Sequence, residues 1–159
     1  MTPSIQLLLI RHGHALPTMR GMSDRERVLS PTGVAEAQRL ADRFQAHALS
    51  VHCAYVSPAP RAFATWQNVA HVFGINASVR NPLYGASPEE IVSILRETPQ
   101  QCRGAAVVGH NPGLEWLASW LSGRTVTLAT GNAVALIGAT SWERLALGGG
   151  QWELSASFP

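Results

Sequence analysis

Short runs of apolar residues mark the strands that this chain is expected to form. IQLLLI (residues 5–10) is apolar at every position except Gln6, which is typical of a strand covered on both faces. The polar stretch 16–29 that follows predicts a loop. The last segment, 142–158, reads as two strands around a run of glycines, antiparallel and at a sheet edge. Three further apolar runs predict strands at residues 53–57, 105–110 and 134–139.

Helical periodicity fills the intervals between these runs. Apolar residues recur at three- and four-residue spacing over about 31–47, with Ser30 as the N-cap and Pro31 at the first helical position. The alternation of strands and helices favours an α/β fold in one domain, residues 1–159: a three-layer sandwich whose mostly parallel sheet has helices on both faces and an antiparallel edge near the C-terminus. Further helices are expected within residues 58–74, 87–98 and 113–123.

The composition narrows the classes of function. The chain has 159 residues, 46% of them hydrophobic, and can therefore bury a sizeable core. Its formal net charge of +2 does not indicate a basic surface that would bind nucleic acid. No apolar run approaches the roughly 18 residues that span a membrane. The N-terminus does not resemble a secretory signal, so a cytoplasmic protein is expected. Cys53 and Cys102 form no metal-binding motif and are expected to be free thiols.

Three of the predicted strands end in residues that suit an anion site. The first runs into RHGH (11–14), the second is followed by Arg61 at the start of a helix, and the strand at 105–110 ends in His110. The carboxyl ends of parallel strands meet at one edge of a sheet, so these residues should converge. Two arginines and two histidines in one crevice would make a good receptor for a doubly charged oxyanion such as a phosphoryl group.

Each residue type suits a step in phosphoryl transfer. A neutral imidazole at His12 can attack phosphorus and form a covalent intermediate. Arg11 and Arg61 can hold the non-bridging oxygens, and His110 can donate to one of them. Gly13 leaves room for the backbone to approach the ligand. His14 could support the site or be incidental. The other histidines, at positions 47, 52 and 71, are expected to be structural.

These motifs resemble the histidine phosphatase superfamily, also called phosphoglycerate mutase-like. LLLIRHGHA resembles its signature strand and RHG loop, LSPTGVAEAQRLA its helix entry, VSPAPRAFATW the segment with the second arginine, and VVGHNPG the late strand with the second histidine. The similarity runs in order from residue 5 to about 122. It implies a phosphohistidine intermediate on His12, a phosphate pocket from Arg11, Arg61 and His110, and neither metal nor cofactor. The short length and GHNPG resemble the small bacterial group typified by the SixA phosphohistidine phosphatases.

One position departs from the family pattern. Asn111 stands where some relatives carry an aspartate, and Glu89 and Glu90, in the region where others carry a glutamate, read as residues of a first helical turn. A strong general acid is therefore expected to be missing, which typically costs about 10²–10⁴-fold on a leaving group that needs a proton. The nitrogen of phosphohistidine can be protonated before the bond breaks, so a phosphorylated protein is the favoured substrate.

Two alternatives stay open. The protein could hydrolyse a small phosphorylated metabolite or nucleotide, with an aromatic residue stacking on a base. It could instead be a phosphate-dependent binding module with weak turnover, although such a module has no need of a nucleophile at His12. The sequence does not decide the oligomeric state. The aromatic residues considered for stacking are Trp66, Tyr84 and Trp116.

Overall fold

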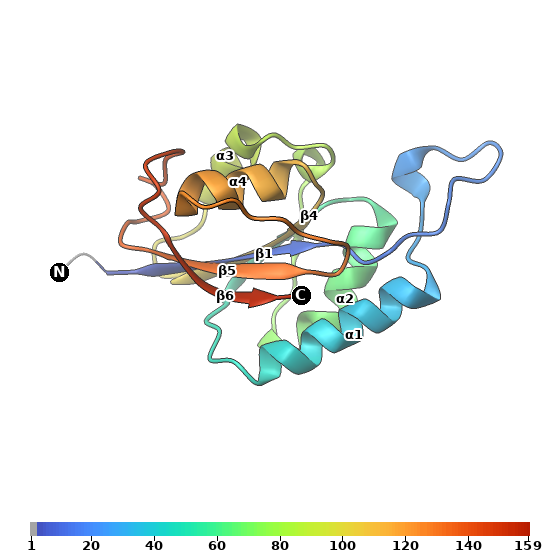
Figure 1. Cartoon of the computed structure of the whole chain (residues 1–159), viewed down its shortest axis with the longest axis horizontal. Helices are drawn as coiled ribbons and strands as arrows, with labels where there is room; N and C mark the ends of the chain where they lie inside the picture. Colours follow the sequence, from blue (N-terminus) through green and yellow to red (C-terminus); the bar gives the residue numbers. More distant parts are fainter. Residues whose placement is uncertain (1–2) are drawn as a thin grey trace.

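The computed structural model describes residues 3–159 as a three-layer α/β sandwich (Figure 1). The six strands are β1 (Ile5–Arg11), β2 (Cys53–Val56), β3 (Ser78–Val79), β4 (Gly104–Gly109), β5 (Ala133–Gly138) and β6 (Glu153–Phe158). The four α-helices are α1 (Pro31–Gln45), α2 (Pro60–Phe73), α3 (Pro88–Arg96) and α4 (Gly113–Ser122). Two short 3₁₀ turns, η1 (Asp24–Glu26) and η2 (Asn81–Leu83), complete the elements.

The strands form one sheet in the order β3-β2-β4-β1-β5-β6. The pairs β1–β4, β2–β4 and β2–β3 are parallel, whereas β1–β5 and β5–β6 are antiparallel. The mostly parallel sheet with an antiparallel C-terminal side confirms the predicted fold class. No helix within residues 3–159 is long and apolar enough to cross a membrane.

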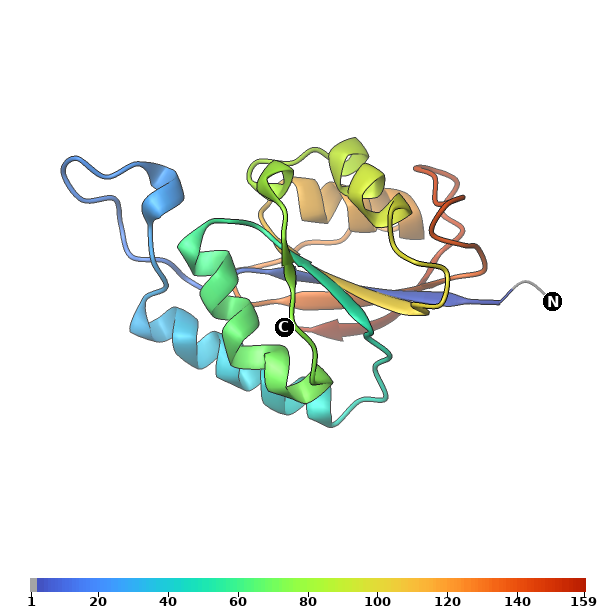
Figure 2. The same cartoon turned by 180° about the vertical axis from the view of Figure 1, so that it is seen from behind.

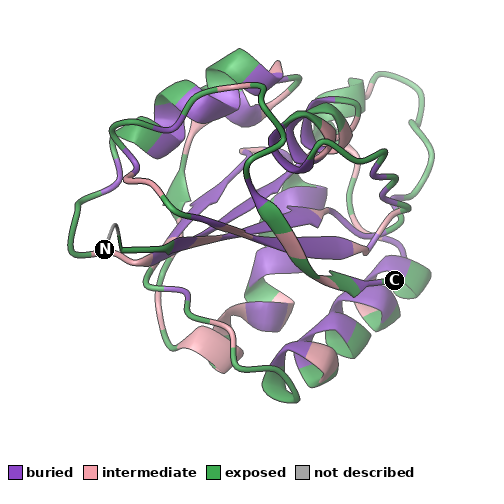
Figure 3. Cartoon of the chain, turned by 60° about the vertical axis from the view of Figure 1, so that its left-hand side comes forward, coloured by how far each residue is buried: buried purple, intermediate pink, exposed green. Residues whose placement is uncertain are grey.

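The core lies on both faces of the sheet, as Figure 3 shows by the buried strands and the buried inner sides of the helices. Successive side chains of β1 point to opposite faces, so Leu7 and Leu9 pack under α3 and α4 while Leu8 and Ile10 pack against α1 and α2. Both sets are fully buried, which explains the unbroken apolar run in the sequence.

Local signals fix where the helices begin. Ser30 Oγ accepts a hydrogen bond from the Gly33 amide at the start of α1, and Ser87 forms a capping box with Glu90 at the start of α3. The chain between β1 and α1 forms an arm, residues 16–29, which projects beyond the carboxyl end of β1 and carries η1 (Figures 1 and 2).

The predicted C-terminal hairpin is wrong in its first half. Only β6 is a strand, and its antiparallel partner is β5. The preceding segment forms turns because Trp142 and Leu145 are both buried in the core beside α3 and α4 instead of alternating along a strand. Trp142 also donates a hydrogen bond from its indole nitrogen to the Cys102 carbonyl at 2.5 Å.

The expectation of free thiols is also wrong. Cys53, at the start of β2, and Cys102, just before β4, are joined in a disulfide across 49 residues of sequence. The two strands are parallel neighbours, so their amino ends lie side by side, which brings together two cysteines that no local motif connects.

Candidate active site

The carboxyl ends of β1 and β4, which are neighbours in the sheet, meet at one small pocket of about 240 Å³. The end of β1 and the residue after it line the pocket, together with the two residues that follow β4. The other lining residues come from α2, from the arm and from the turn after η2. The lining residues are Arg11, His12, Asp24, Arg61, Tyr84, Gly85, His110 and Asn111.

His12 is held in one tautomer. Its Nδ1 lies 2.7 Å from the Gly13 carbonyl oxygen. A carbonyl can only accept a hydrogen bond, so Nδ1 carries the proton and Nε2 presents a lone pair. The Nε nitrogen of Arg61 donates to that Nε2 at 3.3 Å, which agrees with this assignment. This Nε2 therefore lies beside the guanidinium group of Arg61 in the pocket.

The surroundings keep the His12 ring neutral. Burial lowers the pKa of His12 from 6.5 to about 4, and the positive charges of Arg61 and Arg11 act in the same direction. The hydrogen bond to the Gly13 carbonyl opposes these effects without cancelling them. At neutral pH the ring is a base and a nucleophile, not a cation.

Both predicted arginines reach the pocket. Arg61, in the first turn of α2, is only 4% exposed, and two of its other contacts go to Asp24: Nη1 donates to the backbone oxygen at 2.7 Å and Nη2 to carboxylate Oδ2 at 3.1 Å. Arg11 donates from Nη1 to the Leu128 carbonyl at 2.8 Å, and its buried Nε has no hydrogen-bond partner among the described residues. Such an unpaired buried donor suits an anion.

His110 lies opposite His12, with 5.0 Å between the two ring centroids. Its Nε2 is 2.7 Å from Ser57 Oγ, just after β2. Burial, together with the nearby His12 and Arg61, lowers the pKa of His110 from 6.5 to about 3. A bound dianion would act in the opposite direction and favour a protonated His110 that donates to it.

The glycine at position 13, expected to let the backbone approach a ligand, is explained by its packing against two helices. A Cβ on Gly13 would lie 2.6 Å from the Gly33 carbonyl oxygen of α1. The Gly13 amide donates to Thr65 Oγ1 of α2 at 3.0 Å. Gly13 is therefore needed where the loop presses between the two helices, and this packing fixes the position of the adjacent His12.

Asp24 and Gly85 were not predicted to line the pocket, and Tyr84 was considered only for stacking on a base. Asp24, from the arm, accepts from Arg61, from Arg27 Nη1 at 3.0 Å and from the Tyr84 hydroxyl at 2.7 Å. Tyr84 meets the His110 ring edge-on at 5.3 Å between centroids, and Arg25 lies over its face. The polar pattern of residues 16–29 indicated a loop but not which of its charges folds back over the site.

Three predicted accessory residues lie outside the pocket. His14 is exposed and hydrogen-bonds through Nδ1 to Ser30 Oγ at 2.7 Å. Glu90 is occupied by the capping box at the start of α3, and its neighbour Glu89 is exposed. Asn111 does line the pocket, but its side-chain nitrogen donates to the Leu128 carbonyl at 2.8 Å.

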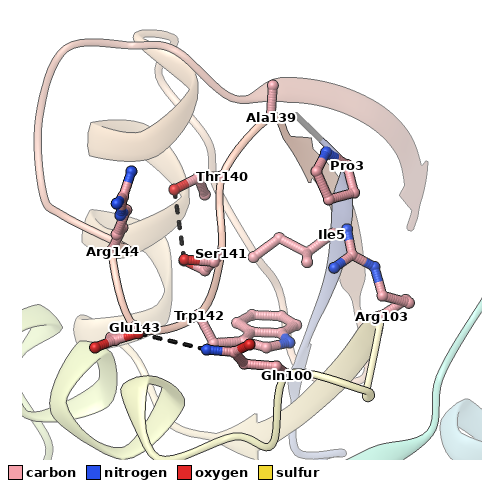
Figure 4. Close-up of a pocket in the computed structure, with 10 residues that line it drawn as sticks. All are labelled: Pro3, Ile5, Gln100, Arg103, Ala139, Thr140, Ser141, Trp142, Glu143 and Arg144. Carbon is pink, nitrogen blue, oxygen red and sulfur yellow. Dashed lines mark hydrogen bonds between the residues drawn. The ribbon is translucent and has the colours of Figure 1, made fainter. Parts of the chain in front are cut away.

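A larger hollow of about 490 Å³ lies at the opposite edge of the sheet, beside the amino end of β1 (Figure 4). It contains no histidine, and its two arginines, Arg103 and Arg144, lie on opposite sides of it in Figure 4. The smaller pocket, with a neutral His12 ring and a buried guanidinium group, is therefore the candidate active site. No group of three or more metal-ligating side chains occurs within residues 3–159.

Comparison with known proteins agrees with this geometry. The sequence model described as histidine phosphatase superfamily (branch 1) matches residues 7–84. An uncharacterized chloroplastic protein of Arabidopsis thaliana is 32% identical over 166 residues, which cover 95% of this chain and 76% of that protein. The chain belongs to the histidine phosphatase superfamily. It is accordingly a phosphatase, a hydrolase of phosphorylated substrates.

Solved structures of this superfamily share the whole fold. The SixA protein of Nakamurella multipartitia has a TM-score of 0.85 at 24% identity, over 97% of this chain and 95% of that one. A protein histidine phosphatase SixA complexed with tungstate has a TM-score of 0.78 at 19% identity, over 97% and 96% of the two chains. A mycobacterial glucosyl-3-phosphoglycerate phosphatase has a TM-score of 0.63 at 14% identity, over 96% and 97%. At these identities the likeness establishes the fold and leaves the substrate open.

Proposed function

We propose that this phosphatase hydrolyses phosphohistidine in proteins through a covalent phosphohistidine intermediate on His12. The observation that carries the proposal is the His12 ring: Nδ1 is fixed by the Gly13 carbonyl, and the lone pair of Nε2 lies beside Arg61 inside the pocket. A neutral, buried imidazole in fixed orientation is a competent nucleophile toward phosphorus.

The proposed reaction has two displacements. The Nε2 lone pair of His12 forms a bond to phosphorus while the bond to the leaving group breaks, and the bonding electrons depart with that group. Arg11, Arg61 and His110 hold the non-bridging oxygens, whose charge grows in the transition state. Water then attacks phosphorus, and His12 leaves with its electron pair restored. Both steps use the same anion-holding groups.

The choice of substrate rests on the acids available in the pocket. Asp24 is the one carboxylate among the described residues that line it, and hydrogen bonds from Tyr84 and Arg27 lower the pKa of Asp24 to about 2. An ionised carboxylate cannot protonate an alkoxide at neutral pH. A phosphoramidate needs no such proton, because its nitrogen can be protonated beforehand. This supports a phosphohistidine substrate over an alkyl phosphate.

The test is a comparison of kcat/KM on a phosphohistidine-bearing protein, an aryl phosphate and an alkyl phosphate. We expect the alkyl ester to react at least about 10²-fold more slowly than the phosphohistidine protein, since it lacks an acid. His12→Ala should abolish turnover of all three. Turnover by His12→Ala at the wild-type rate would refute the mechanism, and equal rates on the three substrates would refute the substrate assignment.

A small phosphorylated metabolite is the second candidate. Its support is the shared fold of a metabolite phosphatase, the mycobacterial enzyme named above, and the small volume of the pocket, about 240 Å³. Comparable cleavage of the alkyl phosphate would favour it. Slow decay of a trapped phosphoenzyme on every substrate would instead favour a phosphate-dependent binding module.

A further inference from the structure

The carboxylate of Asp24 occupies a position that catalysis by Arg11, Arg61 and the two histidines does not explain. It stands at the mouth of the pocket, on the arm, with 57% of its side chain exposed. Oδ1 accepts from Arg27, and Oδ2 accepts from Tyr84 and Arg61. A carboxylate offers about four acceptor sites, so an exposed one with three donors can still take a further donor from a ligand.

This carboxylate remains an acceptor over the working pH range. Hydrogen bonds from Tyr84 and Arg27, together with the charge of Arg61, hold its pKa at about 2. The other charged or titratable groups that line the pocket are Arg11 and the rings of His12 and His110, both neutral at neutral pH. Arg25 and Arg61 lie over the ring of Tyr84. A permanent negative charge beside a phosphate pocket repels the substrate's own charge, so it requires a reason.

We propose that Asp24 is a specificity-determining residue that accepts a hydrogen bond from a cationic N–H on the leaving group, in particular the distal ring N–H of a phosphoimidazolium. The inference rests on the proposed function and deepens it. A carboxylate at this position favours leaving groups that bear a positive N–H and disfavours leaving groups that bear a second anion.

The exchange then balances without a general acid. His12 begins neutral, with its proton on Nδ1, and the substrate ring begins as a cation with its proton on the distal nitrogen. The Nε2 lone pair of His12 forms the new P–N bond, and the electron pair of the old P–N bond stays on the departing ring, which leaves neutral. His12 is now the phosphoimidazolium. No proton moves in the transfer.

The site then supplies an acceptor for each ring. The Gly13 carbonyl already accepts the Nδ1 proton of His12 at 2.7 Å, and that hydrogen bond strengthens as the His12 ring gains positive charge. Asp24 does the same for the substrate ring before it departs. This arrangement explains how the pocket manages without an acid at Asn111, Glu89 or Glu90.

A competing role for Asp24 is to hold Arg61 in place. A substitution can distinguish the two roles, because one of the two hydrogen bonds between Arg61 and Asp24 goes to the backbone oxygen of Asp24 and does not depend on its side chain. Asp24→Asn keeps that contact and nearly the same shape while removing the charge. A loss of Arg61 positioning would slow all substrates equally, whereas a loss of the leaving-group contact would depend on the charge of the leaving group.

The experiment measures kcat/KM of wild type and Asp24→Asn on phosphoimidazole, phenyl phosphate and 4-carboxyphenyl phosphate. The ratio of wild type to variant for each substrate cancels the intrinsic reactivity of that substrate. We expect the ratio for phosphoimidazole to exceed that for phenyl phosphate by roughly 10- to 100-fold, the usual effect of a hydrogen bond to a charged group. The ratio for 4-carboxyphenyl phosphate should be the lowest of the three.

The pH profile of kcat on phosphoimidazole gives an independent readout. Asp24 raises the pKa of the bound substrate N–H, so the limb on which kcat falls with rising pH should lie at lower pH in Asp24→Asn than in wild type. Asp24→Glu retains the charge and should preserve the wild-type order of substrates. Glu89→Gln removes an exposed carboxylate outside the pocket and serves as the matched control.

Equal ratios for the three substrates, with an unshifted pH limb, would overturn the inference and reduce Asp24 to a support for Arg61. That result would leave the proposed phosphatase intact, since the wild type would still turn over its substrates. Failure of the wild type to hydrolyse any of the three would overturn the proposed function itself, and this inference with it.

Discussion

Acidification from about pH 7.5 to about pH 5 is expected to destabilise the fold through His12 and His110, because both rings are buried in their neutral form. The pKa of each ring lies below the ordinary 6.5, at about 4 for His12 and about 3 for His110. As pH falls below 6.5 the unfolded chain binds protons that the folded protein does not. The stability that the neutral rings provide is therefore fully present above pH 6.5 and is lost progressively as the pH falls below 6.5.

The size of the effect follows from linkage. Each pH unit below 6.5 costs about 1.4 kcal/mol per histidine until the folded pKa is reached, so about 2 kcal/mol per ring is lost at about pH 5. This loss of stability at about pH 5 depends little on the pKa values of the two rings in the folded protein, because both pKa values lie below 5. The two rings together should lose about 4 kcal/mol, a large share of a typical stability of about 5–15 kcal/mol.

The assay is urea unfolding followed by tryptophan fluorescence at the two pH values, in a buffer without phosphate, since a bound anion would stabilise the charged rings. His12→Gln and His110→Gln should each reduce the pH-dependent loss by about 2 kcal/mol. His52→Gln, which removes an exposed ring outside the pocket, is the matched control. Parallel pH dependence in wild type and both pocket variants would refute the assignment of neutral buried rings.

Two other substitutions and the reduction of the disulfide test the site and its framework. Arg61→Lys should lower kcat by about 10²-fold or more at unchanged Tm within a few degrees, because a point charge replaces a fork that contacts His12 and Asp24 together; an unchanged kcat would contradict this. Gly13→Ala should lower both Tm and kcat, because the new methyl group meets the Gly33 carbonyl at 2.6 Å; wild-type values for both would show that the loop can move aside. Reducing the Cys53–Cys102 disulfide should cost about 2–4 kcal/mol in urea unfolding, with Cys53→Ser insensitive to the reductant; equal stability of the oxidised and reduced protein would disprove the cross-link's contribution.

The fold was predictable because its signals are local. The unbroken apolar run of β1 follows from burial on both faces, and the starts of α1 and α3 follow from Ser30 and Ser87. The convergence of Arg11, His12, Arg61 and His110 needed one further rule, that parallel strands end at the same edge. These four residues lie within a few positions of a strand end, so knowing the strands was enough to bring them together.

The two failures share a different cause. The segment around Trp142 and Leu145 looks like a strand in its apolar content, but both side chains point into the same core. Periodicity in six residues does not separate that case from a strand. Cys53 and Cys102 become neighbours only because β2 and β4 are adjacent in the sheet, which depends on the strand order rather than on the spacing of the cysteines.

The position of Asp24 in the pocket could not be predicted from the sequence. The residues proposed to hold the phosphoryl group lie at strand ends and helix starts, and regular structure fixes their positions. Asp24 lies on an arm whose path is set by long-range contacts with Arg61 and Tyr84, 37 and 60 residues away in the chain. No periodicity signals such a contact. A polar loop immediately after a nucleophile is therefore the place to look for leaving-group recognition, because a loop can place a charge at the mouth of a pocket without disturbing the strand ends beneath it.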